Sequence, residues 1–175
     1  MKRTRVNVGG RVKHTRASVL KRAEAEYQAL DAIVRRLRPT DFGRYVFDER
    51  APIRWTVKDV IAHLTAWKLR DVRRISRDRS PLKAYDAPYG SDQANTRIYE
   101  RSHRTPAKTI VAEHRAAHRA MRKALREAPA DRFAKRWSPH WPADLVGHVG
   151  SHRRMHLNPL FAKPAKHQRQ AARLR

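Results

Sequence analysis

The histidines are the residues whose spacing most strongly suggests chemistry in this sequence. His148, His152 and His156 follow one another at four-residue intervals in the segment HVGSHRRMH. Residues four apart on a helix lie one above the other on one face, so adjacent members of this series can direct two imidazoles at one ion. The first and last would lie about 12 Å apart along the helix axis. We therefore expect a third ligand to come from another helix.

His63 is the best candidate for that third ligand. In VIAHLTAW it lies three residues after Val60 and four before Trp67, on the apolar face of a predicted helix. A polar ring that points inward needs a partner. A hydrogen-bonded core histidine would explain His63 alone, but together with the last-helix histidines it predicts a metal site. Asp59, one turn earlier, is placed to orient the His63 ring or merely to favour a helix N-terminus.

A second pair of histidines has the same spacing. His114 and His118 are four residues apart in EHRAAHRA, among arginines and alanines. This composition favours a solvated helix face over a binding site. We therefore do not expect this pair to carry chemistry.

Four helical segments must position these side chains. Apolar residues recur at three- and four-residue steps along each, which is the pattern of an amphipathic helix. Thr56 and Asp59 form a capping box, and Thr105-Pro106 predicts a kink or restart within the third segment. The predicted helices cover residues 18–37, 56–76, 91–128 and 140–161, with Ser18 and Ser138-Pro139 as start signals. No segment reads as a strand, so the fold class is all-α, an up-and-down four-helix bundle.

Composition limits the kind of site. The 175 residues include no cysteine, which excludes disulfides, thiolate metal sites and cysteine nucleophiles. Any metal must be held by His, Asp or Glu. The absence of cysteine fits a cytoplasmic protein, and no apolar stretch approaches the length of a membrane span or a signal-peptide core.

The net charge is the other prominent feature. Lys and Arg number 41 against 16 Asp and Glu, which gives +25. We expect a disordered basic arm over residues 1–16, the bundle over 17–162, and a disordered basic tail over 163–175. The bundle itself stays strongly basic when both tails are set aside. A positive field of this size favours nucleic acid as a partner, although solvated arginines alone would also explain it.

Three motifs carry a resemblance to a known family. WTVKDVIAHLTAW, from Trp55 to Trp67, resembles the second-helix signature of the DinB-like superfamily, and HRRMH resembles its last-helix HxxxH. NTRIY, from Asn95 to Tyr99, is similar to the ClbS/DfsB branch. The resemblance spans roughly residues 18–162.

The resemblance implies a four-helix bundle with a divalent ion held by His63, His152 and His156. His148 is an additional histidine in register, so the last-helix pair can instead be His148 and His152. Zinc, nickel or manganese are all compatible with imidazole ligands. Leu157-Asn-Pro follows the final histidine in place of Arg-Gly-Gln, which argues against the thiol-transferase branch.

The resemblance also implies a class of activity. We expect a metal-dependent enzyme, such as a ClbS/DfsB-like hydrolase or protective protein that acts on an electrophilic small molecule. Asn95, Tyr99 and Asp59 are the candidates for further catalytic groups. Two alternatives stay open: a basic nucleic-acid-associated bundle with a structural metal or none, and a bundle that acts only through partners, among them a second copy of itself.

Overall fold

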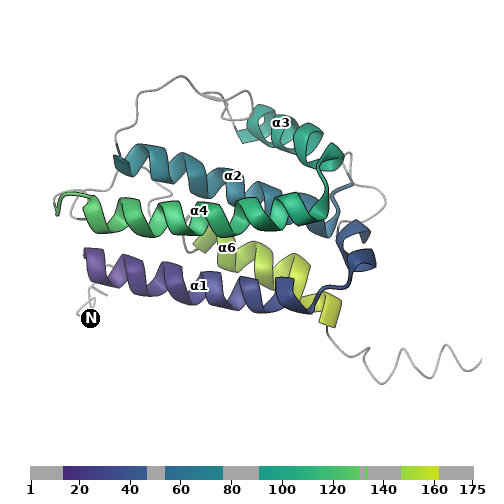
Figure 1. Ribbon diagram of the computed structural model, residues 1–175, viewed down its shortest axis with the longest axis horizontal. Helices are drawn as coiled ribbons and strands as arrows, with labels where there is room; N and C mark the ends of the chain where they lie inside the picture. Colours follow the sequence, from purple (N-terminus) through teal and green to yellow (C-terminus); the bar gives the residue numbers. More distant parts are fainter. Residues whose placement is uncertain (1–13, 47–53, 77–90, 131–132, 134–146, 162–175) are drawn as a thin grey trace, which may run out of the picture.

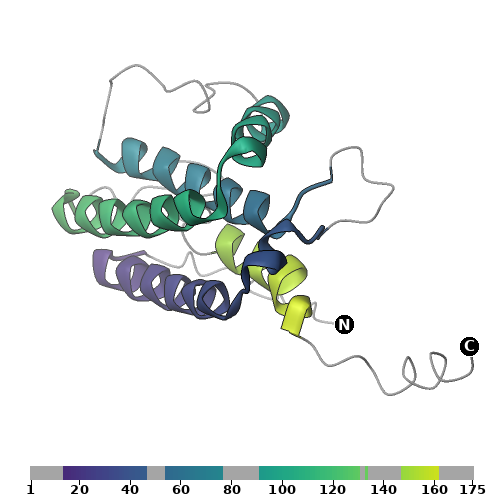
Figure 2. The ribbon, with the colours of Figure 1, turned by 45° about the vertical axis from the view of Figure 1, so that its right-hand side comes forward.

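The computed structural model describes residues 14–46, 54–76, 91–130, 133 and 147–161. Over these residues the protein is a helical bundle (Figures 1 and 2). Its long helices are α1 (Arg16–Arg36), α2 (Val57–Ser76), α3 (Ser91–Arg104) and α4 (Ala107–Glu127), and α6 (Gly147–His152) completes the bundle. The described residues form no strand, only an isolated bridge between Tyr45 and Thr56. The predicted all-α, four-helix architecture is confirmed.

The direction of the helices explains how distant segments meet. In Figure 1, α1 and α6 run in one direction and α2 and α4 run in the opposite direction. Along the chain, α3 follows α2 and returns to the end of the bundle at which α4 begins. The third predicted segment is therefore two helices: α3 ends at Arg104 and α4 begins at Ala107, with Pro106 as its N-cap. Proline cannot continue a helix because it lacks the backbone N–H, so the expected restart at this point is confirmed.

The first helix begins earlier than its sequence pattern predicts. Ser18 was the expected cap, but Thr15 is the N-cap residue and α1 begins at Arg16. The Ser18 N–H donates to Thr15 Oγ1 at 3.1 Å, and the Thr15 N–H donates to Ser18 Oγ at 3.0 Å. Ser18 thus supplies the second half of a capping box rather than the cap itself.

The second helix begins where the capping box predicts. The Thr56 N–H donates to Asp59 Oδ2 at 2.9 Å, and the Asp59 N–H donates to Thr56 Oγ1 at 3.3 Å. These reciprocal bonds satisfy backbone donors that have no partner inside the helix. They fix the register of α2 and hence the direction in which His63 points.

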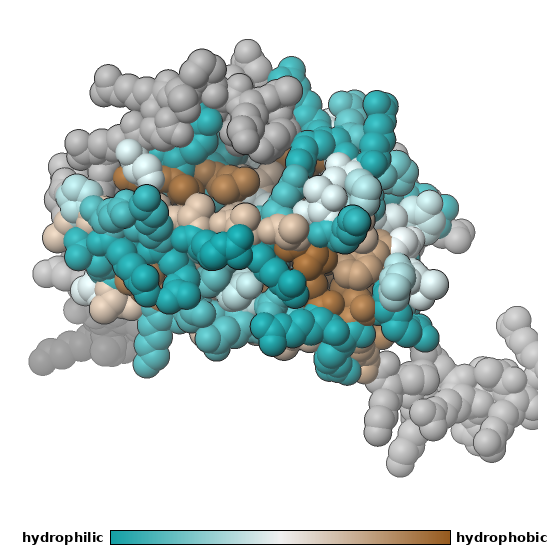
Figure 3. All heavy atoms as spheres, in the orientation of Figure 1, coloured by the Kyte–Doolittle hydropathy of each residue, from teal (hydrophilic) through white to brown (hydrophobic). Residues whose placement is uncertain are grey.

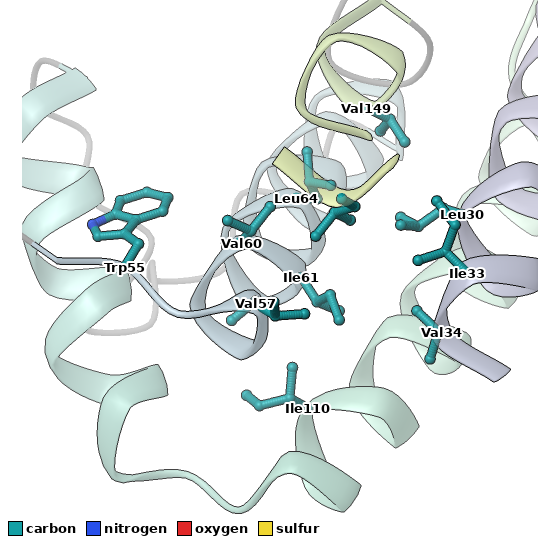
Figure 4. Close-up of a cluster of buried hydrophobic side chains, with 12 residues drawn as sticks. Leu30, Ile33, Val34, Trp55, Val57, Val60, Ile61, Leu64, Ile110 and Val149 are labelled. Atoms are coloured by element: carbon teal, nitrogen blue, oxygen red, sulfur yellow. The ribbon is translucent and has the colours of Figure 1, made fainter. Parts of the chain in front are cut away.

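Of the two hydrophobic clusters among the described residues, one lies between α1, α2, α4 and the last helix. Ile61 and Leu64 of α2 meet Leu30 of α1, Ile110 of α4 and Val149 of α6, and each of these five side chains is almost fully buried (Figure 4). Fully burying one such side chain contributes roughly 1.5–3 kcal/mol. This cluster therefore holds α6 against α2, the two helices that carry the candidate ligands.

The loop before α2 is covered only in part. Phe42 packs against the core, but Tyr45 is 51% exposed and receives the Arg54 guanidinium over its ring at 3.9 Å. Contact with a cation explains why this aromatic side chain stays outside the core. Phe47 and the predicted Ser138-Pro139 helix start lie outside the described residues, as do most of the basic arm and all of the tail from residue 163.

None of the described helices combines the length and the apolar character needed to cross a membrane. The face formed by α1 and α4 is instead mostly hydrophilic, with smaller apolar areas between the charged side chains (Figure 3).

Candidate metal centre

Three histidines converge between α2 and α6. His63 of α2 and His148 and His152 of α6 each offer a ring nitrogen, and these three atoms all lie within 4.8 Å of one another. The Nε2 atoms of His63 and His148 are 2.9 Å apart. The His152 ring centroid is 4.8 Å from that of His63 and 4.7 Å from that of His148. An arrangement in which three imidazoles face one point is typical of a metal site.

Local helix geometry accounts for the arrangement. His148 and His152 are one α-helical turn apart and so project from one face of α6. Val149, between them in sequence, is 1% exposed and packs in the same core cluster as Val60 and Leu64 of α2. Burial of this apolar face brings α6 against α2, and the histidines beside it face His63.

His156 lies at the edge of this group. Its ring centroid is 5.2 Å from that of His152, but it is not among the three residues whose ring nitrogens converge. The chain from Arg153 to Leu157 is a π-helix, in which the Asn158 N–H donates to the Arg153 carbonyl. A π turn is wider than an α turn and is frequent at functional sites. The geometry thus groups His148, the alternative ligand, with His63 and His152.

Two of the converging histidines, His63 and His152, are neutral at pH 7. Burial, followed by repulsion from His148 and His152, lowers the pKa of His63 to about 2, and the ring is 4% exposed. Burial and the neighbouring histidines lower the pKa of His152 to about 4. Metal ions bind the neutral imidazole, so ligands of this kind need not lose a proton at pH 7. The Nδ1 atom of His152 is buried and has no hydrogen-bond partner in the described part of the chain.

Aromatic and amide side chains surround His63. The Trp55 ring centroid lies 4.8 Å and the Trp67 ring centroid 6.1 Å from that of His63. The Trp67 Nε1–H donates to Asn95 Oδ1 at 3.1 Å, and a hydrogen bond between His63 and the Asn95 side chain, which favours the protonated ring, opposes the lowering of the His63 pKa. Of the three candidate catalytic groups, Asn95 is the one that reaches the histidines.

Asp59 and Tyr99 have other neighbours. Asp59 Oδ2 accepts from the Thr56 hydroxyl at 2.7 Å, and Asp59 Oδ1 accepts from the Ser102 hydroxyl at 2.8 Å. Asp59 therefore caps α2 and ties it to α3, and none of its contacts in the described residues is to His63. Tyr99 packs against the core, with its ring centroid 5.1 Å from that of His103.

The pair of histidines on α4 was expected on a solvated face, and that expectation is wrong. His114 is 0% and His118 3% exposed, and the Tyr27 ring of α1 stacks on His118 with centroids 3.5 Å apart. The sequence did contain the signal, because His114 and His118 fall in the helical stripe of Ile110 and Leu125. The neighbouring arginines favoured the wrong interpretation, a solvated helix face.

A separate groove of about 390 Å³ lies between α2, α3 and α4. It is lined mainly by alanines, with an ion pair between Arg101 of α3 and Glu113 of α4. Its volume is within the range of small-molecule pockets. Its lining residues do not include His63, His148 or His152.

Comparison with known proteins now decides the family. The sequence profile of the DinB superfamily matches residues 46–159, which include all three converging histidines and His156. The chain belongs to the DinB superfamily. No protein with curated annotation matches this DinB-superfamily chain significantly.

Two solved structures share the fold of this DinB-superfamily chain. An uncharacterised protein from Escherichia coli UTI89 has a TM-score of 0.63 at 16% identity, over 81% of this chain and 92% of the other. The colibactin self-resistance protein ClbS, in complex with a double-stranded DNA, has a TM-score of 0.63 at 11% identity, over 89% of this chain and 100% of ClbS. At these identities the similarity shows the fold alone.

Proposed function

We propose that this DinB-superfamily chain binds one divalent metal ion through His63, His148 and His152. The observation that carries the proposal is the convergence of their three ring nitrogens within 4.8 Å. Two imidazoles bound to one tetrahedral ion at about 2.0–2.1 Å would place their nitrogens roughly 3.4 Å apart. The 2.9 Å between His63 and His148 is close to this value, so small rotations of the rings would suffice.

The residues around the centre suit a reactive site better than a purely structural one. Three histidines leave coordination positions for water or substrate, and a bound ion would supply a Lewis acid. Trp55 and Trp67 limit the access of water to His63, and Asn95 holds a polar group beside it. Zinc, nickel and manganese all accept such ligands.

Within this proposal, the activity is hydrolysis or neutralisation of an electrophilic small molecule. Two observations support this class: the ClbS/DfsB-like NTRIY motif that supplies Asn95, and the structural similarity to a protein described as a self-resistance protein. Asn95 would orient the substrate, while Tyr99 and Asp59 would act through the packing of α2 and α3.

Metal analysis tests the proposal directly. Tag-free protein, incubated with zinc, nickel or manganese and desalted, should retain about one ion per chain by plasma mass spectrometry. The double variant His63→Ala/His152→Ala should retain none while circular dichroism shows an intact helical fold. Absence of bound metal from the folded wild-type protein would refute the proposal. Metal-loaded protein should then be assayed for consumption of electrophilic three-membered-ring compounds, with the double variant as control.

A second candidate function rests on the positive charge. Exposed basic side chains follow one face of α4: Lys108, Arg115, Arg119, Lys123 and Arg126. The net charge of the whole chain is +25, and the similar fold of ClbS was solved with a double-stranded DNA. We propose that this face contacts the phosphates of nucleic acid, which would bring a protective enzyme close to DNA.

Charge-reversal variants distinguish a DNA contact at α4 from general electrostatic attraction between the basic chain and DNA. Duplex DNA binding, followed by fluorescence anisotropy, should weaken steeply with salt. Arg119→Glu/Lys123→Glu on α4 should weaken it more than Arg97→Glu/Arg104→Glu on α3, which changes the net charge equally. Equal losses in the two variants would mean that α4 is not the contact face.

A further inference from the structure

We propose that Lys68 and His114 form a second buried site, which holds a small monovalent anion such as chloride between α1, α2 and α4. This site is separate from the three histidines between α2 and α6. It does not depend on the proposed metal.

Lys68 is the first reason to expect an anion. Its side chain belongs to α2, is 2% exposed, and has its Nζ atom 5.5 Å from the centre of the Tyr27 ring. Lysine is almost never fully buried unless its charge is paired. In the described part of the chain this ammonium has neither a hydrogen bond nor an ion pair. Burial lowers the pKa of Lys68 to about 8, which leaves most of the amine charged at pH 7.

The carboxylates of Asp31 and Glu24 already have other partners. Asp31 pairs with Arg35 at 2.7 Å and with Arg115 at 3.4 Å. Glu24 Oε2 lies 3.1 Å from Nε2 of the neutral His118 ring and pairs with Arg122 at 3.5 Å. Asp71, one turn after Lys68 on α2, forms no ion pair with it. The described residues thus provide arginines for Asp31 and Glu24 but no acid paired with Lys68.

His114 is the second reason. Both of its ring nitrogens are buried and lack hydrogen-bond partners in the described residues, as does Nδ1 of His118. Burial, followed by the charge of Lys68, lowers the pKa of His114 to about 3, so the ring is neutral at pH 7. A neutral imidazole always carries one N–H, and this donor needs an acceptor.

One anion would satisfy both requirements. It would accept from the Lys68 ammonium and from an N–H of His114, and it would balance the buried charge of Lys68. A buried water would accept the same hydrogen bonds but would leave the lysine charge uncompensated. The complete burial of His114 favours an ion as small as a halide.

Halide-dependent stability tests this site. Thermal unfolding should be followed while chloride replaces gluconate at constant ionic strength. The wild-type Tm should rise by roughly 5 °C or more and then saturate, as for a ligand that binds the folded state. Lys68→Met should lose this rise. Lys108→Met removes the same charge from an exposed position on α4 and should retain it.

Bromide soaked into a crystal gives a readout that needs no variant. An anomalous peak in contact with Lys68 Nζ is expected. A wild-type Tm that does not respond to chloride, an equal response in Lys68→Met, or density for water alone beside Lys68 would each overturn the proposal. If Lys68→Met fails to fold, the bromide peak decides.

Discussion

His63 and His148 place their Nε2 atoms 2.9 Å apart across the contact between α2 and α6. Without an ion, one of these rings must donate an Nε2–H to the Nε2 atom of the other. With an ion, both rings would carry the proton on Nδ1 and direct Nε2 at the metal. The two histidines therefore report, through their tautomers, whether the centre is loaded.

The identity of the third ligand gives the first prediction. The His148→Ala variant should lose metal affinity by at least tenfold, because His148 directs Nε2 at the same point as His63. The His156→Ala variant should retain affinity close to wild type, because its ring is not in the converging group. Competition with a chelator of known affinity measures both.

The opposite ranking of these two variants would show that the ligand set is His63, His152 and His156. That result would also mean that the π-helical segment from Arg153 to Leu157 rearranges on metal binding and brings His156 to the ion. Retention of metal by both variants would indicate that either histidine completes the site.

Tryptophan fluorescence gives a second prediction. The Trp67 ring centroid lies 6.1 Å from those of His63 and His148. A paramagnetic ion such as nickel at this distance should quench its emission in a saturable titration. The Trp67→Phe variant should show a clearly smaller change with the same midpoint. Because the Trp55 ring centroid is 4.8 Å from that of His63, Trp55 should also be quenched, and quenching that persists in full in a Trp55→Phe/Trp67→Phe variant would place the ion elsewhere.

The capping role of Asp59 gives a third prediction. Asp59→Ala leaves the Thr56 N–H and the Thr56 hydroxyl without an acceptor in a buried region, and it removes the tie to Ser102, whose hydroxyl keeps only the Tyr99 carbonyl at 3.1 Å. We expect the free energy of unfolding in urea to fall by roughly 2–4 kcal/mol. Asp92→Ala, at the exposed start of α3, should cost less than about 1 kcal/mol. A small effect at Asp59 would argue against its anchoring role.

The buried histidine of α4 gives a fourth prediction, for the dependence of stability on pH. Burial lowers the pKa of His114 from 6.5, the ordinary value for histidine, to about 3 in the folded protein. Between these values the unfolded chain binds more protons, so stability is fully present above about pH 6.5 and falls as the pH decreases. Protonation of His114 alone should lower the free energy of unfolding by about 2 kcal/mol between pH 8 and pH 5.

Urea unfolding at the two pH values, in a buffer without halide, measures this loss. His114→Phe should reduce the difference between the two values, whatever its effect on stability at pH 8. An unchanged difference would mean that other groups dominate the acid sensitivity.

The helices and their caps were predictable because their signals are local. The Thr56 and Asp59 capping box and the restart at Pro106 depend on neighbours within a few residues, and both are confirmed. The stripe around Val60 also placed His63 on the inward face of α2. These features require only helix periodicity and backbone hydrogen bonding.

The features that were missed depend on contacts between distant segments. The burial of His114 and His118 follows from the packing of Tyr27, which lies on another helix. The convergence of His148 with His63 depends on the axial position of α6 against α2. The spacing of the last-helix histidines is the same for His148 and His156, so periodicity alone left the choice open.

The π turn from Arg153 to Leu157 has a consequence for variation in chain length. A π-helical segment accommodates one more residue than the α-helix it interrupts. Deletion of a single residue within it could therefore be absorbed by reversion to an α-helical turn, whereas a deletion before His152 would break the alignment of the paired imidazoles. Natural length differences among homologues at this end of the bundle should accordingly fall after His152 and leave the converging histidines untouched.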